Sequence, residues 1–123
     1  RELMIDRTCA LCGAEYEWGV HAVAFAAAVG LTPEQLAATV EPSEDADLWD
    51  PAERAVLALA DALHRQATVD DDLFAELRLH FDDAQILELT ATAGWYHTIS
   101  FVIGVARVPL EPWAARFPVA PAP

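Results

Sequence analysis

The sequence contains no lysine: all seven basic residues are arginine, and 20 acidic residues give a formal net charge of −13. So acidic a surface repels phosphate backbones and anionic lipid headgroups, and we expect no nucleic-acid partner and no membrane binding. With 54% hydrophobic and 22% charged residues, however, the chain is too apolar to be disordered. Its 123 residues can close one hydrophobic core but not comfortably two, so a single domain is expected.

Cysteine is also scarce, and the two present, Cys9 and Cys12, form a C-x-x-C pair. Two cysteines do not make the disulfide framework of a small secreted protein, so a cytoplasmic location is the expectation. The pair then indicates either redox chemistry or two thiols packed as small hydrophobic side chains. Their position at a helix end, before Gly13, gives no N-terminal dipole to lower a thiol pKa, which favours the structural role.

Metal-ligand patterns are equally sparse. A zinc site would need two ligands besides Cys9 and Cys12, and the sequence has no second C-x-x-C and no close histidine pair. Asp61 and His64 form a single D-x-x-H, whereas carboxylate-bridged centres in helical bundles show E-x-x-H twice. We therefore expect no metal and no cofactor.

Glycine and proline fall between segments with the apolar spacing of helices, and β-branched alternation is almost absent, which predicts an all-α fold. Thr32, Asp50 and Asp82 each precede a Glu or Gln three residues later, a helix-capping pattern. Helices are expected over residues 1–11, 14–29, 33–40, 51–66, 70–80 and 83–106.

The two ends of the sequence also carry expectations. Prolines from residue 109 onward predict a helical domain over 1–108 and an extended tail over 109–123. The chain begins at Arg1, without a methionine and already in a helical pattern, so we expect it to be part of a longer protein.

The last predicted helix, 83–106, is apolar around most of its circumference. Glu88, His97, two glycines and several threonines oppose a membrane span, and its flanks lack basic residues except Arg107. A second copy of the chain is the simpler cover for such a helix. The sequence therefore predicts a homo-oligomer.

The pattern that points to chemistry is Glu17 and His21, which lie four apart on one helix face. A carboxylate beside an imidazole raises its basicity and is a usual arrangement for proton transfer. The same spacing also occurs in polar pairs with a purely structural role. Spacing alone leaves both interpretations open.

Several segments recur in a characteristic order and spacing: Arg1–Leu3, Tyr16–Trp18 with His21, Gly30–Thr32, Ala60–Arg65, Glu88–Leu89 and Gly94–Tyr96. Together they resemble the carboxymuconolactone decarboxylase family of the alkylhydroperoxidase D-like superfamily, over nearly the whole chain. The resemblance implies an all-helical alkylhydroperoxidase D-like domain that assembles as trimers or hexamers, with active sites near subunit contacts.

Redox members of that superfamily carry a C-x-x-C whose second cysteine lies four residues before the motif histidine, and a glutamate nineteen residues before it. Laid on this sequence, His21 is the histidine and Glu2 is the relay glutamate. The two cysteine positions fall on Ala14 and Glu17. The resemblance therefore does not supply the disulfide peroxidase mechanism at its usual place.

The leading hypothesis is a decarboxylase-like lyase that performs acid/base chemistry on a small organic substrate. His21 is expected to be the general acid or base, with Glu17 as its carboxylate partner and Glu2 orienting the imidazole. Tyr16 is expected to donate a hydrogen bond, and Arg7 to bind an anionic group of the substrate. One alternative is a thiol-dependent alkylhydroperoxidase with peroxiredoxin activity through Cys9 and Cys12. Another is a non-catalytic oligomeric binding protein.

Overall fold

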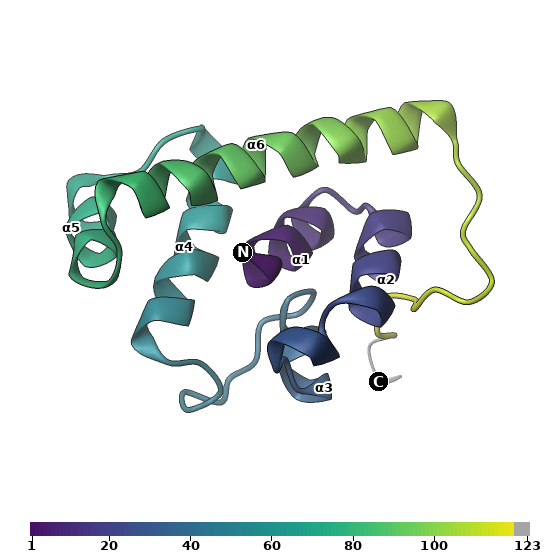
Figure 1. Ribbon diagram of the computed structural model, residues 1–123, viewed down its shortest axis with the longest axis horizontal. Coiled ribbons are helices and arrows are strands. Elements are labelled where there is room, and N and C mark those ends of the chain that lie inside the picture. The colour runs from purple at the N-terminus through teal and green to yellow at the C-terminus, as the bar shows by residue number, and fades with distance from the viewer. Residues whose placement is uncertain (120–123) are drawn as a thin grey trace.

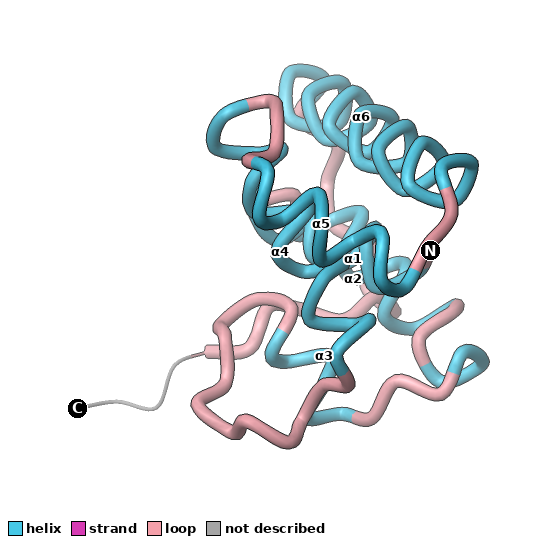
Figure 2. Tube along the Cα trace, turned by 90° about the vertical axis from the view of Figure 1, so that its left-hand side faces the viewer, coloured by secondary structure: helices cyan, strands magenta, loops and turns pink. Residues whose placement is uncertain are grey.

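A short central helix organises the structure, a computed structural model that describes residues 1–119. This helix, α1 (Glu2–Leu11), lies between α2 (Glu15–Ala24) and α4 (Pro51–Gln66), and the long α6 (Asp83–Ala106) passes across the top of all three in the view of Figure 1. A 3₁₀ helix, η1 (Ala27–Val29), and α3 (Pro33–Ala38) follow α2, and α5 (Asp71–His80) precedes α6. Seen from the side, α6 and α3 lie on opposite sides of α1 (Figure 2). No strand occurs among the described residues, which confirms the predicted all-α fold.

Local sequence signals place most of the helix ends. Gly13 and Gly30 adopt positive φ angles of 65° and 83°, a left-handed conformation that glycine takes without a steric penalty, and they end two helical segments. Each predicted capping pattern forms a reciprocal pair of hydrogen bonds between side chain and backbone, at Thr32 with Gln35, Asp50 with Glu53, and Asp82 with Gln85. These bonds satisfy backbone N–H groups that the first helical turn leaves free.

The predicted second helix, 14–29, is wrong at its C-terminal end, because α2 stops at Ala24. The backbone N–H groups of Phe25 and Ala26 both donate to the carbonyl of His21, at 2.9 and 3.3 Å, and the chain turns into η1. The turn buries Ala26, and the Phe25 ring, four residues after His21, lies against the imidazole with 4.9 Å between ring centroids. Helix propensity could not reveal this break, since the segment is rich in alanine, the best helix former.

The hydrophobic core lies on two sides of α1. Leu3 and Met4 pack with α4, α5 and α6, while Ile5 and Cys9 pack with Trp18 of α2 and Tyr96 of α6. At roughly 25 cal/mol per Å² of buried apolar surface, these contacts are the main stabilising term for so short a helix. The core thereby fixes the N-terminus of α1 beside α2.

The segment after α6 turns back against α2. The N–H of Ala115 donates to the carbonyl of Gly19 at 3.2 Å, and the N–H of Phe117 donates to Glu15 Oε1 at 2.8 Å. The Phe117 ring also packs against Trp18, with 5.3 Å between ring centroids. Of the predicted tail, 109–123, the last four residues lie outside the described part of the chain.

Helix α6 keeps a large apolar surface exposed in the single chain. Its large exposed apolar side chains are Leu87, Trp95, Phe101, Val102 and Val105. No helix among the described residues is long and apolar enough to cross a membrane. The predicted oligomer, which would cover this surface, stays a prediction.

We expect Gly19→Ala to destabilise the fold by loosening the C-terminal segment from α2. A Cβ at position 19 would overlap the carbonyl oxygen of Ala115, a backbone atom that cannot move alone. Overpacking of this kind costs about 1–3 kcal/mol. Chemical denaturation measures the change in unfolding free energy, and limited proteolysis reports release of the segment.

Gly94→Ala is the matched control, because a Cβ at position 94 of α6 meets no atom within 4 Å. Alanine is favoured over glycine inside a helix by about 1 kcal/mol, so this variant should be unchanged or slightly more stable. Equal unfolding free energies for the two variants would show that close packing of the C-terminal segment against Gly19 does not contribute to stability.

Candidate active site

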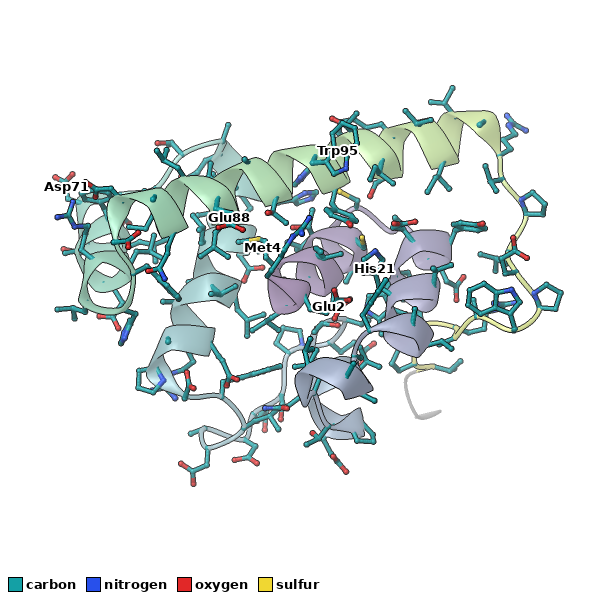
Figure 3. All side chains as sticks on the ribbon, viewed as in Figure 1. Glu2, Met4, His21, Asp71, Glu88 and Trp95 are labelled. Carbon is teal, nitrogen blue, oxygen red and sulfur yellow. The ribbon has the colours of Figure 1, made fainter. Side chains whose placement is uncertain are left out.

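The N-terminal turn of α1 and the C-terminal turn of α2 bring Glu2 and His21 together. Glu2 Oε1 lies 2.9 Å from His21 Nδ1, and the two side chains are only 11% and 9% exposed (Figure 3). A carboxylate is favoured at a helix N-terminus and an imidazolium at a helix C-terminus, so both helix dipoles support the pair. The predicted convergence of Glu2 and His21 is therefore present in the structure.

The other imidazole nitrogen, Nε2, has two polar neighbours. Glu17 Oε1 of α2 is 3.3 Å away, in the predicted i,i+4 arrangement. The hydroxyl of Tyr96, which comes from α6, is 3.4 Å away, and its ring meets the imidazole edge-on. His21 is thus held between carboxylates on both sides, with a phenol beside the nitrogen that faces Glu17.

The surroundings of His21 set its pKa through opposing effects. Burial would lower the pKa, but the hydrogen bond and charge of Glu2, together with the charge and hydrogen bond of Glu17, more than offset it. The net result is a pKa above the usual value for histidine. The imidazolium form therefore persists to higher pH than in a free histidine.

Asp6 adds a third carboxyl group to the site, and sequence reasoning missed it. It lies one turn after Glu2 on α1, is fully buried, and neither carboxyl oxygen accepts a hydrogen bond from a described residue. Burial first, then the charge and hydrogen bonding of Glu2, raise the pKa of Asp6 far above its usual range. The carboxyl group gains a partner only as the neutral acid, donating its proton to Glu2.

A cavity of about 270 Å³ opens beside this group of side chains. Its lining residues are Arg1, Glu2, Ile5, His21, Phe25, Val29 and Tyr96. The walls are mostly apolar, while His21, Glu2 and Tyr96 supply polar atoms. A pocket of this make-up suits a small organic molecule with one or two polar groups.

Two residues expected in the site lie elsewhere. The Tyr16 hydroxyl donates to Glu111 Oε1 at 3.1 Å, so it binds the C-terminal segment, and Tyr96 stands beside the imidazole instead. Arg7 Nε donates to Asp61 Oδ1 at 2.8 Å, and its Nη1 donates to the carbonyl of Thr39. Arg7 does not line the cavity, whereas Arg1 does.

The two cysteines are free thiols in settings that suppress thiolate formation. Cys9 is fully buried, and its burial, followed by the charges of Glu17 and Asp6, raises its pKa far above the usual value. Cys12 is half-buried, and burial raises its pKa as well, with the Ser100 hydroxyl opposing the shift. The thiolate is the nucleophile in thiol chemistry, so neither environment favours attack on a peroxide.

Sequence signals for the missed residues differ in strength. Asp6 follows Glu2 by four residues, so its place on the same helix face could have been read from spacing. Phe25 likewise follows His21 by four residues, so its contact with the imidazole could also have been read from spacing. Tyr96 carried no such signal, because it reaches His21 from another helix, 75 residues away.

Comparison with known proteins supports both the fold and the family signal. Residues 1–62 match the carboxymuconolactone decarboxylase family. A protein of unknown function from Agrobacterium tumefaciens, suggested to be the antioxidant defence protein AhpD, has a similar crystal structure, with a TM-score of 0.79 and 24% sequence identity. The match covers 89% of this chain and 75% of that one. No curated protein matches the sequence.

We expect Asp6→Asn to flatten the pH dependence of stability. Above about pH 4 the unfolded chain releases the Asp6 proton while the folded protein retains it, so rising pH favours unfolding until the raised folded pKa is passed. The wild type should thus lose up to about 1.4 kcal/mol per pH unit relative to the variant. An asparagine amide can still donate to Glu2, and it has no proton to lose in this range.

Denaturant unfolding from pH 5 to pH 8 measures the effect, with Asp72→Asn, an exposed acid on α5, as the control. The gap between wild type and Asp6→Asn should widen with pH, whereas the control should follow the wild type. Parallel profiles for all three proteins would mean that Asp6 is not held as a neutral acid.

Proposed function

Because the chain belongs to the carboxymuconolactone decarboxylase family, we propose that it is a lyase-type enzyme in which His21 transfers protons to or from a small organic substrate. The substrate class is a lactone or carboxylic acid that loses carbon dioxide. The observation that supports this proposal is the imidazole held between Glu2 and Glu17 at the wall of an apolar cavity.

The hydrogen bonds divide the work between the two imidazole nitrogens. Nδ1 donates its proton to Glu2, which fixes the tautomer and leaves Nε2 as the atom that gains or loses a proton. Loss of carbon dioxide leaves an electron pair on carbon, and protonated Nε2 can deliver the proton that replaces it. Glu17 stabilises the imidazolium, and Tyr96 can donate to Nε2 once the proton has left.

Neutral Asp6 contributes to the same chemistry through its contact with Glu2. A protonated carboxyl group donating to Glu2 limits the negative charge buried at this end of α1. The neutral form of Asp6 avoids placing two adjacent carboxylates in one buried site, which would be costly. Asp6 is therefore a positioning residue that acts through Glu2.

Substrate binding would use the remaining groups of the cavity. An anionic substrate meets an unfavourable overall charge of −13, so a local cation is needed. Arg1 lines the cavity and can bind a carboxylate through two parallel hydrogen bonds. Phe25, Val29 and Ile5 offer apolar contacts for the carbon skeleton.

We expect His21→Gln to lower kcat by about 10²–10⁴-fold, the usual contribution of a positioned acid or base. Glu2→Gln should lower kcat less and shift the pH profile to lower pH, because the variant loses the group that raises the pKa of His21. Carbon dioxide release from a panel of carboxylated lactones and β-keto acids is the measurement. His80→Gln is the control, since His80 pairs with Glu76 on α5.

The same proteins decide between this activity and the alternatives. Hydroperoxide reduction recycled by a dithiol and abolished in Cys9→Ser/Cys12→Ser would establish the thiol-dependent enzyme instead. If a panel compound binds tightly without being converted, and His21→Gln still binds it, the result would support the binding-protein hypothesis. Decarboxylation that survives His21→Gln would overturn the acid/base proposal.

The exposed surface of α6 supports a proposal about assembly as well. Val102 and Val105 are 61% and 85% exposed, and Trp95 is exposed on the same helix. Adjacent apolar side chains of this size are expected to be covered by protein. A second copy of this chain, in a trimer or hexamer, is the proposed cover.

We expect a Val102→Glu/Val105→Glu variant to dissociate the oligomer to monomers, because an interface would have to bury the new charges unpaired. Size-exclusion chromatography with light scattering gives the mass. Leu79→Glu, at an exposed apolar position on α5, should keep the wild-type mass. A monomeric wild type at micromolar concentration would refute the assembly.

A further inference from the structure

A second group of chemically active side chains lies at the other end of α1, away from His21. Cys12 follows the last residue of α1, His64 belongs to α4 and His97 to α6. One ligand atom of each, the cysteine sulfur and one nitrogen of each imidazole, lies within 4.8 Å of the other two. The fold therefore brings together two histidines that lie 33 residues apart in the sequence, a pair that sequence spacing did not indicate.

The hydrogen bonds of His97 determine where its lone pair lies. Its Nδ1 is 2.7 Å from the carbonyl oxygen of Ala93, which can only accept, so Nδ1 carries the proton. Its Nε2 therefore presents a lone pair, and this atom lies 2.9 Å from Nδ1 of His64. A backbone carbonyl that fixes the far nitrogen in this way is the usual support of a metal-binding histidine.

The spacing of the donor atoms suits a small tetrahedral ion. Zinc–nitrogen bonds of about 2.0–2.1 Å separate two imidazole nitrogens by about 3.3 Å, close to the 2.9 Å between His64 and His97. The two rings are stacked with 30° between their planes, and binding one ion would require their hydrogen bond to open slightly. A tetrahedral zinc shell places sulfur and nitrogen about 3.6 Å apart, so the Cys12 sulfur, within 4.8 Å of both nitrogens, would have to move by no more than about 1.2 Å.

We propose that Cys12, His64 and His97 form a binding site for a divalent transition-metal ion of the zinc type. One sulfur and two imidazoles are the donors that Zn²⁺ accepts and that Mg²⁺ and Ca²⁺ do not. The three ligands leave a fourth position, and because His64 is exposed, that position can be taken by water. The ion would cross-link α1, α4 and α6.

The other cluster with ligand-type atoms within 4.8 Å of one another, Glu2, Asp6 and His21, is a less suitable metal site. There a metal ion would have to break the charge-assisted contact between His21 and Glu2 at 2.9 Å, whereas at the proposed site it would replace a weaker hydrogen bond between two imidazoles. A cation would also have to displace the proton of Asp6. This second cluster serves as the internal comparison in the experiment.

The test uses chelator-treated protein kept reduced with a phosphine, which competes weakly for the metal. Zn²⁺ affinity is measured in competition with a chromophoric chelator, and Co²⁺ serves as the spectroscopic probe. We expect one metal ion per chain and a sulfur-to-cobalt charge-transfer band that reports the Cys12 bond. Metal that binds the folded protein should also raise its Tm.

His64→Gln, His97→Gln and Cys12→Ser should each weaken Zn²⁺ binding at least tenfold, since even the loss of a group supporting a ligand costs about 10–100-fold. Cys12→Ser should also abolish the charge-transfer band. His64 is exposed, so its substitution tests the site without endangering the core. His80→Gln and His21→Gln should retain both affinity and band.

Two results would overturn the proposal. One is the absence of one-to-one binding and of the charge-transfer band in the wild type. The other is binding that persists in His64→Gln and Cys12→Ser but is lost in His21→Gln or His80→Gln, which would place the metal elsewhere. Neither result depends on an enzymatic activity, so the outcome is independent of the proposed lyase function.

Discussion

The hydrogen bond between Glu2 and His21 is the constraint on which the rest of the site depends. It joins two side chains that are each about nine-tenths buried, at the meeting point of two helix ends. Glu2 and Glu17 are acidic, so a neutral imidazole would leave the negative charge of this region uncompensated. A raised pKa at His21 and a raised pKa at Asp6 are two responses to the same requirement, which is to keep the buried net charge small.

Three parts of the chain hold α2 in the position that this contact needs. Glu2 reaches it from α1, Tyr96 reaches it from α6, and the segment around Ala115 rests on Gly19. Phe25, four residues after His21, packs its ring against the imidazole and completes the arrangement.

The parts of this structure that could be predicted are those encoded by neighbouring residues. Capping pairs three residues apart and glycines at positive φ carry their own signal, so most helix ends were correctly expected. Glu17 and His21 share a helix turn, and Glu2 was placed through the family resemblance. The approach of Tyr96 to His21, the capture of Arg7 by Asp61 and the pairing of His64 with His97 depend on how helices pack. No spacing rule reports such contacts, because each joins residues from different helices.

The two ends of α1 carry different chemistry, and the C-x-x-C lies toward the second of them, with Cys12 just after the last helical residue. Ten helical residues span about 15 Å, which separates the carboxylates at Glu2 from the sulfur of Cys12. Cys9, in the interior, is kept protonated by its burial and by nearby acidic groups, so it is a poor partner for disulfide formation. A metal ion bound to Cys12 would make the second thiol unavailable for disulfide formation as well, since one sulfur cannot bind a metal and form a disulfide at the same time. The transition-metal site and the redox interpretation of the C-x-x-C therefore compete for the same atom, and the stacked histidines beside Cys12 favour the metal.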